Sequence, residues 1–379
     1  MTAAGVLVVL VGVGLAYANG ANDVSKGIAT LVGSGVTDYR RAIAWGSAWT
    51  AVGGILGALF AGAMLTTFGG GLLTPGATST FAAALATLSG AAGWVFFATR
   101  AGLPVSTTHA IVGSLVGVAA LAYGVDAVRW SALGGKVFLP LLLTPFASLA
   151  VTGALLRAAR GRAAGGGAAA DCLCAGLEPA SVARGVATGS SVALVPGSAT
   201  LRLVAASAEA CATSHPDALR LTLGHLHWLT SGATSLARGM NDAPKIVALA
   251  LSASALGATA AVQPAVLYAV VTFGMVAGSL VGGRRVTRVL ACDVTPMDNR
   301  EGFAANLVTA ALVTAGAVHG LPMSTTHVAS GGIIGAGAQR GTLDLRSLRT
   351  IALAWVVTLP AAGILGAASY FLATVVTRW

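Results

Sequence analysis

Two short polar motifs stand out in a sequence that is otherwise largely apolar. Each is an asparagine followed by an aspartate: Asn22-Asp23 early in the chain and Asn241-Asp242 later. An ionised carboxylate inside an apolar, membrane-spanning stretch is costly to insert, so its presence indicates a functional site. In a purely structural role, each pair would cap a broken helix. Because the motif occurs twice in the same local context, we favour the functional interpretation.

Two rows of hydroxyl side chains form a second candidate site. Both rows follow a Gly-Leu-Pro segment, at which a helix is expected to begin with free backbone N–H groups. These groups and the helix dipole attract anions, although a hydroxyl row can also be buried in ordinary packing. Two rows that face each other could hold a small tetrahedral oxyanion between them. The rows are Ser106, Thr107 and Thr108, and Ser324, Thr325 and Thr326.

A histidine follows each hydroxyl row, at His109 and His327. An imidazole could donate a hydrogen bond to an anion or relay protons. A single histidine is more often a packing residue, so both interpretations stay open.

These motifs occur twice because the chain contains an internal repeat. The segment Ala18 to Lys26 returns as Ala237 to Lys245 after 219 positions, and Gly102 to His109 returns as Gly320 to His327 after 218 positions. Two unrelated motifs with one spacing indicate duplication of a whole module. We predict a first transmembrane repeat over residues 1–157, a linker over 158–220 and a second repeat over 221–379.

Basic residues predict that the two repeats have opposite orientations. The loop after the first Asn-Asp motif contains Arg40 and Arg41, whereas its counterpart around residues 252–263 is uncharged. The next loop reverses this pattern, because residues 66–80 are uncharged and the counterpart contains Arg284, Arg285, Arg288 and Arg300. Cytoplasmic loops are enriched in lysine and arginine, so the repeats are expected to be inverted. The linker is then cytoplasmic and both termini are extracytoplasmic.

Composition places the whole chain in a lipid bilayer. Of its 379 residues, 56% are apolar and 9% are charged, and the mean hydropathy is +0.83. Long apolar runs and 51 glycines suit closely packed membrane helices and do not suit the alternating strands of a β-barrel. The net charge of +10 comes from scattered basic residues, which excludes a nucleic-acid surface. We predict an all-α polytopic membrane protein with inverted repeats, broken or re-entrant helices, and roughly 10–12 membrane helices.

The cysteines carry little functional signal. Cys172 and Cys174 form a Cys-x-Cys pair in the linker, and Cys211 and Cys292 follow. We expect free thiols in a reducing cytoplasm. A metal site completed by histidines is the alternative. The candidate histidines are His215, His225 and His227.

The paired motifs resemble those of the PiT family of inorganic phosphate transporters, and the resemblance covers both repeats. It implies a cation-coupled secondary transporter of the cell (plasma or inner) membrane, with a central site between the repeats. The implied phosphate ligands are Asn22, Asp23, Asn241, Asp242 and both hydroxyl rows. The same four asparagines and aspartates are possible Na+ ligands. Na+ or H+ would be the coupling ion, with no other cofactor and with a homodimer possible.

Two lysines depart from the family pattern. Where the family usually has a second asparagine, this chain has Lys26 and Lys245, three positions after each aspartate. Our hypothesis is that these ammonium groups replace one or both coupling cations, so that transport is proton-coupled or uncoupled. Alternatively, each lysine extends toward a helix end or only neutralises its aspartate.

Three rival functions follow from the same residues. Monobasic phosphate can donate a hydrogen bond to Asp23 or Asp242, and sulfate cannot, which favours phosphate. The two lysines would suit a dianion, so a sulfate permease is the second interpretation, and a passive anion channel is the third. An enzyme is not expected, because the sequence has no nucleophile elbow, zinc motif or nucleotide loop.

Overall fold

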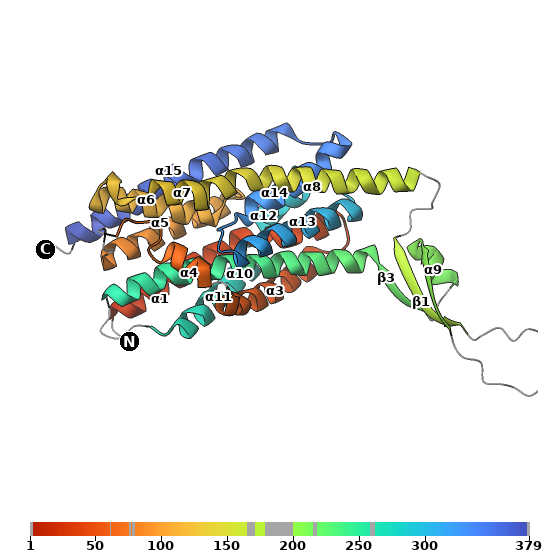
Figure 1. Ribbon diagram of the computed structural model, residues 1–379, viewed down its shortest axis with the longest axis horizontal. Coiled ribbons are helices and arrows are strands. Elements are labelled where there is room, and N and C mark those ends of the chain that lie inside the picture. The colour runs from red at the N-terminus through yellow and green to blue at the C-terminus, as the bar shows by residue number, and fades with distance from the viewer. Residues whose placement is uncertain are drawn as a thin grey trace, which may run out of the picture. The chain divides into compact units, whose positions relative to one another are not determined.

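The computed structural model describes residues 3–60, 62–75, 77, 80–164, 171–178, 200–214, 218–257 and 262–376. They belong to two compact units (Figure 1). The helical unit contains Met1–Leu156 and His227–Trp379, and the small unit contains Arg157–Leu226. Both predicted repeats therefore contribute to one helical unit.

The helical unit is built from two sets of helices in the same order, one from each predicted repeat. The first set is α1 (Ala3–Asp23), α2 (Ser25–Gly33), α3 (Tyr39–Phe60), α4 (Gly62–Phe68), α5 (Phe81–Arg100), α6 (Thr107–Tyr123), α7 (Trp130–Leu133) and α8 (Leu139–Ala164). The second set is α10 (Leu223–Gly257), α11 (Pro264–Gly282), α12 (Arg284–Arg288), α13 (Asn299–Val318), α14 (Thr325–Arg340) and α15 (Leu345–Val376). Among the described residues, seven helical stretches are long and apolar enough to cross a membrane, which confirms the predicted fold class.

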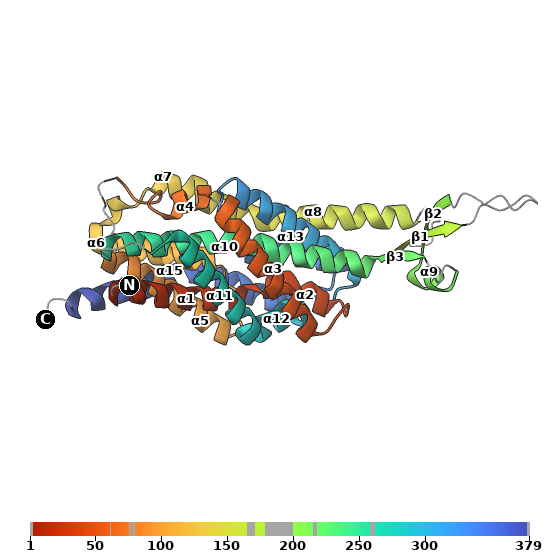
Figure 2. The same cartoon turned by 90° about the horizontal axis from the view of Figure 1, so that it is seen from below.

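The two sets run in opposite directions. Thr30 in α2 hydrogen-bonds to His227 near the start of α10, with Oγ1 and Nε2 3.0 Å apart. Gly12, much earlier in α1, packs beside Ala250 toward the end of α10. Figure 2 shows α1 and α2 running from left to right and α10 from right to left. Inverted repeats are therefore confirmed.

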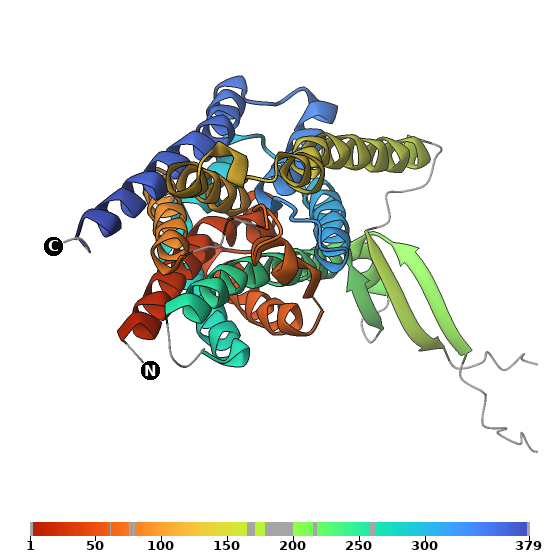
Figure 3. The same cartoon turned by 60° about the vertical axis from the view of Figure 1, so that its left-hand side comes forward.

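Helices of the two halves exchange partners around an approximate twofold axis. In α11, Gly278 packs against the backbone of Tyr17 in α1, and in α3, Gly53 packs equivalently against Leu236 in α10. Helix α6 packs on α15, and α14 packs on α8 through the same kind of glycine contact. Figure 3 shows red and orange helices of the first half among teal and blue helices of the second. The interleaving explains why the halves form one unit.

Two helical hairpins open at opposite ends of the helical unit. At the open end of the α5–α6 hairpin, the Tyr123 hydroxyl lies 2.8 Å from the backbone nitrogen of Thr80 and accepts its hydrogen bond. At the open end of the α13–α14 hairpin, Arg340 forms ion pairs of 2.7 Å with both Asp298 and Glu301. Each hairpin is therefore fastened at its base, which leaves its tip to reach into the unit.

The hairpin tips are where the helices break. Gly102 and Gly320 have φ values of +74° and +68°, which a residue with a Cβ rarely adopts. The extended backbone after each glycine ends at the serine that caps the next helix. The Asn-Asp motifs interrupt the helices less than predicted. Only Val24 separates α1 from α2, and α10 continues through its motif with Pro244 inside.

The small unit is a three-stranded antiparallel sheet with one helix. Its strands are β1 (Cys172–Glu178), β2 (Thr200–Ala206) and β3 (Leu219–Thr222), in the order β2-β1-β3, and α9 spans Ala208–Ser214. The sequence predicted only a linker over residues 158–220, so the sheet is a new feature. Strand pairing depends on residues far apart in sequence, and the short runs of β1 to β3 do not reveal it.

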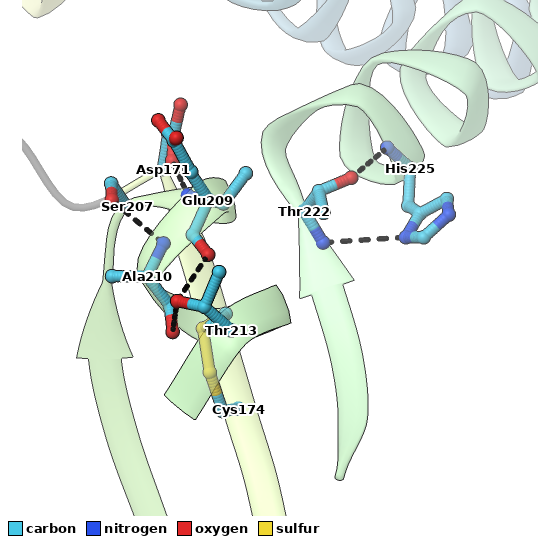
Figure 4. Close-up of a disulfide and its surroundings, with 10 residues drawn as sticks. Asp171, Cys174, Ser207, Glu209, Ala210, Thr213, Thr222 and His225 are labelled. Carbon is cyan, nitrogen blue, oxygen red and sulfur yellow. Dashed lines mark hydrogen bonds between the residues drawn. A yellow bond between two sulfur atoms is a disulfide. The ribbon is translucent and has the colours of Figure 1, made fainter. Parts of the chain in front are cut away.

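The prediction of free cysteines was wrong for two of the four. Cys174 and Cys211 form a disulfide between β1 and α9 (Figure 4). Cys172 is a buried free thiol and Cys292 an exposed one. Among the histidines proposed as metal ligands, His215 lies outside the described residues. His225 instead bonds to Thr222 in the small unit, and His227 bonds to Thr30 in the helical unit.

Close helix packing gives the first prediction. A Cβ added at Gly20 would overlap the backbone of Met275, whereas a Cβ at Gly14, on the same helix, would meet nothing within 4 Å. We expect Gly20→Ala to destabilise the protein by about 1–3 kcal/mol, because overpacking shifts the helices apart. Gly14→Ala is the control and should melt at or above the wild-type temperature. Equal melting temperatures for the two variants in detergent would contradict this packing.

Candidate functional site

The tips of the two hairpins meet each other directly. Thr326 Oγ1 donates a 2.7 Å hydrogen bond to the carbonyl of Val105 in the opposite tip. In the contact related to it by the approximate twofold axis, Thr108 Oγ1 lies 3.3 Å from the carbonyl of Met323. The two predicted hydroxyl rows are thus brought together from opposite ends of the unit.

The serines of the two rows cap the helices that follow. The Oγ atoms of Ser106 and Ser324 each accept a 3.2 Å hydrogen bond, from the backbone N–H of His109 and His327 respectively. All six side chains of the two rows are buried. Helices α6 and α14 therefore begin beside the tip contact. Free backbone N–H groups at the start of a helix are the usual ligands of an anion bound at a helix N-terminus.

The first Asn-Asp motif holds a lysine in a cage of oxygens. Lys26 Nζ lies 2.8 Å from Asp23 Oδ1, 2.7 Å from Asn22 Oδ1 and 2.8 Å from the Asn22 carbonyl. An ammonium group has three N–H donors, so these contacts use all of them. Lys26 thus lies between the amide and carboxylate oxygens that the sequence analysis predicted as Na+ ligands.

The second Asn-Asp motif repeats this arrangement with different partners. Lys245 Nζ lies 3.2 Å from Asp242 Oδ1, 2.8 Å from Thr108 Oγ1 and 3.1 Å from the Met323 carbonyl. Its three donors are also satisfied. Because Thr108 and Met323 belong to the two tips, Lys245 joins the second motif to both hairpins.

The two asparagines fasten the motifs to the tips. Asn22 donates from Nδ2 to the carbonyl of Leu103 at 3.0 Å and accepts at Oδ1 from the backbone nitrogen of Val105 at 3.2 Å. Asn241 Nδ2 donates to the carbonyl of Met323 at 2.9 Å. A movement of either tip must therefore break contacts with an Asn-Asp motif.

Sequence reasoning missed two residues at the centre, Asn19 and Arg238. They are equivalent in the repeat, 219 positions apart, and they touch, with Arg238 Nη1 3.4 Å from Asn19 Oδ1. The Asn19 amide lies 3.0 Å from Asp23 Oδ2 and 3.1 Å from Asp242 Oδ2, so it bridges both carboxylates. Arg238 was visible in the repeated motif as an arginine inside an apolar stretch, which is itself a functional signal.

Arg238 gives the centre an excess of positive charge. Its side chain is fully buried and donates from Nη2 to the hydroxyls of Thr50 and Ser279 at 2.6 and 3.3 Å. Each lysine is matched by its own aspartate, whereas the partners of the guanidinium are neutral. In the ordinary ionisation states, three cations face two carboxylates. A centre with one uncompensated positive charge favours binding of one monoanion.

The two histidines form a pair away from the carboxylates. The rings of His109 and His327 are 4.6 Å apart, and His327 also packs 3.9 Å from the ring of Trp355. His327 Nδ1 lies 3.1 Å from the carbonyl of Leu141. Among the described hydrogen bonds, none joins either ring to an aspartate or a lysine. The pair lines an apolar groove rather than the charged centre.

The structure thus brings all four predicted segments to one place, while their role as ligands stays a prediction. Asp23, Thr107 and Asn19 meet at Asp23 Oδ2, and Lys245 joins Asp242 to Thr108. The arrangement brings hydroxyls, amides and cations together at one buried point. It contains no nucleophile activated by a base among the described residues.

Comparison with known proteins gives a consistent result. Residues 19–366 match the Phosphate transporter family. The chain is 30% identical over 374 residues to a Mycobacterium bovis protein named "Probable low-affinity inorganic phosphate transporter", covering 96% of this chain and 76% of that protein. It is 31% identical over 414 residues to "Inorganic phosphate transporter 2-1, chloroplastic" of Arabidopsis thaliana, covering 93% and 69%.

A solved structure described as "The sodium-dependent phosphate transporter" has the same fold. Its TM-score is 0.75, at 18% sequence identity, over 99% of this chain and 100% of the other.

The buried ion pairs give the second prediction. Asp23→Asn leaves the Lys26 ammonium buried without its counter-ion, and removal of one partner of such a pair costs about 3–5 kcal/mol. We expect a large drop in melting temperature for Asp23→Asn. A double variant, Asp23→Asn with Lys26→Met, should recover most of the loss because no unpaired charge is left. Asp38→Asn is the control, since Asp38 and Arg41 form an exposed pair. A double variant as unstable as the single one would contradict the pairing.

Proposed function

The chain belongs to the phosphate transporter family, and from this membership we propose that it is a secondary transporter of inorganic phosphate. Members of this family are transporters and not enzymes. The observation that carries the proposal is the buried guanidinium of Arg238, whose hydrogen-bond partners are all neutral, close to the point where two hydroxyl-bearing hairpin tips converge. Phosphate would bind there and be released on either side of the membrane.

Alternating access is supported by the way in which the hairpins are fastened. The α5–α6 hairpin opens at one end of the helical unit and the α13–α14 hairpin at the other. Rocking of one hairpin would separate the Thr326–Val105 and Thr108–Met323 contacts and open the site to one side. These contacts close the path between the ends, which favours a carrier over a passive channel.

The charge balance favours monobasic phosphate as the transported species. Both lysines are already matched by aspartates at 2.8 and 3.2 Å, so only Arg238 offers charge to a substrate. One monoanion neutralises this excess, whereas a dianion such as sulfate leaves a net negative charge in an apolar surrounding. Monobasic phosphate also has protons to donate to the carboxylates, and sulfate has none.

The lysines support transport that does not require sodium. Each ammonium already has three oxygen partners, and in the first motif these include the amide and carboxylate oxygens expected to hold a cation. A sodium ion would have to compete with a charge fixed to the chain. We therefore propose coupling to protons, or transport driven by the phosphate gradient alone.

The membrane orientation is supported by charge at one end of the helical unit. Most arginines of the helical unit lie near the ends of α2 and α3, of α11 to α13, and of α14 and α15. They are Arg40, Arg41, Arg284, Arg285, Arg288, Arg300, Arg340, Arg346 and Arg349. Among the described residues, the opposite end has Arg129 and Lys136. We place the basic end and the linker in the cytoplasm, with both termini outside the cell membrane.

Replacing both lysines by the asparagine of the family pattern gives the third prediction. In proteoliposomes, wild-type uptake of labelled phosphate should be the same in sodium and in choline. Lys26→Asn with Lys245→Asn should make uptake sodium-stimulated by roughly tenfold, about 1.4 kcal/mol of cation binding.

The third lysine of the chain, Lys136, is exposed and provides the control variant Lys136→Asn. It should behave as wild type. Strict sodium dependence of the wild-type protein, without stimulation by an acidic exterior, would contradict the replacement of the cations.

Substrate competition gives the fourth prediction. Uptake of labelled phosphate should increase as the external pH falls below the second pKa of phosphate, because the monobasic form is then dominant. Tenfold excess arsenate should inhibit uptake, and tenfold excess sulfate should leave most of it intact. Equal inhibition by sulfate at both acidic and alkaline pH would identify a transporter for tetrahedral oxyanions in general.

An Arg238→Gln variant should lose uptake by about tenfold or more, because the excess charge is gone.

A further inference from the structure

The three cysteines of the small unit converge on one point. Cys172 and Cys174 lie two positions apart on β1, so their side chains leave the same face of the sheet. Helix α9 covers that face and contributes Cys211. The three sulfur atoms all lie within 4.8 Å of one another, and all three residues are buried.

Helix α9 is fixed over this face by the residues that lead into it. Asp171, directly before β1, accepts a 2.7 Å hydrogen bond at Oδ1 from the backbone nitrogen of Ala208. Ser207 accepts a 3.1 Å bond at Oγ from the backbone nitrogen of Ala210 (Figure 4). The strand and the helix that supply the sulfurs are therefore held together by polar contacts independent of the cysteines.

The large apolar side chains of the sheet face away from this cluster. Leu173 pairs across the sheet with Leu221, and Ala175 pairs with both Leu203 and Leu219. The four leucines are 40 to 78% exposed. In the described part of the unit, the apolar neighbours of the cysteines on the covered face are small: Val204, Ala206 and Ala218. Thr222 and Arg220 of β3 pair across the sheet with Cys172 and Cys174. A unit this small cannot rely on such a core, and small domains of this kind use disulfides or a structural metal.

A disulfide alone leaves part of this arrangement unused. The Cys174–Cys211 bond involves two sulfurs, and the thiol of Cys172 is buried next to it. The cytoplasmic location of the linker is part of the proposed function, and cytoplasmic disulfides are kept reduced. Reduction by a cellular dithiol transfers two electrons and two protons and leaves three thiols around one point.

We propose that the reduced Cys172, Cys174 and Cys211 form a binding site for one thiophilic d10 metal ion, of the class of Cu+ and Zn2+. Three thiolates select soft cations of this kind over Mg2+ or Ca2+. Binding releases one proton from each thiol and forms three metal–sulfur bonds. Among the described residues, no histidine, carboxylate or further cysteine joins the three sulfur atoms. Three sulfur ligands are sufficient for Cu+, whereas Zn2+ would take its fourth ligand from solvent. The metal and the disulfide are alternative cross-links of the same unit.

The test uses the full-length protein, reduced and purified in detergent without oxygen. One portion is loaded with Cu+ in competition with bathocuproine disulfonate, and another with Zn2+ in competition with a chromophoric chelator. Bound metal is then measured by mass spectrometry after desalting. We expect about one ion per wild-type chain, and an at least tenfold lower content in Cys172→Ser, Cys174→Ser and Cys211→Ser. Cys292→Ser is the matched control and should retain the metal, since Cys292 is exposed and lies in the helical unit.

A second measurement does not depend on the folding of the variants. Metal bound to the wild-type protein should protect three cysteines from alkylation and leave Cys292 reactive. X-ray absorption should show sulfur ligands at about 2.3 Å. Absence of metal in the reduced protein, or unchanged metal in Cys172→Ser, would overturn the proposal. Phosphate uptake measured on the same preparations separates the two proposals. Transport can be intact when metal binding fails, and metal binding can be intact when transport fails.

Discussion

The structure depends on neutralising two carboxylates in the middle of apolar helices. Asp23 and Asp242 are buried, and leaving either charge unpaired would cost about 3–5 kcal/mol, a large part of the stability of a typical domain. The chain solves this locally, with a lysine one helical turn after each aspartate. It has only three lysines against 19 arginines, and two of the three are at these positions. The three donors of a compact ammonium match the three oxygen partners found at each of these positions.

The approximate twofold axis then explains both the symmetry and the asymmetry of the centre. Duplicated motifs place the tips, the hydroxyl rows and the ion pairs in matching positions. Where equivalent residues meet near the axis they need not be identical, and Asn19 opposes Arg238. Two arginines at these positions would repel each other, and two asparagines would leave the centre neutral. One of each gives an odd charge, so an approximately symmetric centre carries one net positive charge when all its groups are in their ordinary ionisation states.

Most of the architecture could be predicted from sequence, because the repeat and the basic loops are encoded in residue types at regular spacing. Convergence of Asn22, Asp242 and the hydroxyl rows followed from the same symmetry. Arg238 was missed because the repeat aligns it with Asn19, a residue of different chemistry. The helix break expected at Asn241 is absent, since α10 tolerates Pro244 without ending. The small sheet and its Cys174–Cys211 bond rest on contacts between distant segments, which local sequence does not record.

A cation that is fixed to the chain changes what transport can be coupled to. A mobile sodium ion contributes its gradient because it enters on one side and leaves on the other. Lys26 and Lys245 cannot leave, so all that either can exchange with the two compartments is a proton. If the ammonium groups keep their protons through the cycle, the substrate is driven only by its own gradient and the membrane potential. If one aspartate–lysine pair passes its proton to the side on which the hairpin opens, transport becomes coupled to protons.

Which of these two schemes applies depends on whether tip movement breaks the Lys245 contacts to Thr108 and Met323, which join that lysine to both hairpins. The described hydrogen bonds of Lys26 stay within its own motif, and only Asn22 connects them to a tip. Lys245 is therefore the better candidate for the proton carrier, and Lys26 for the permanent counter-ion.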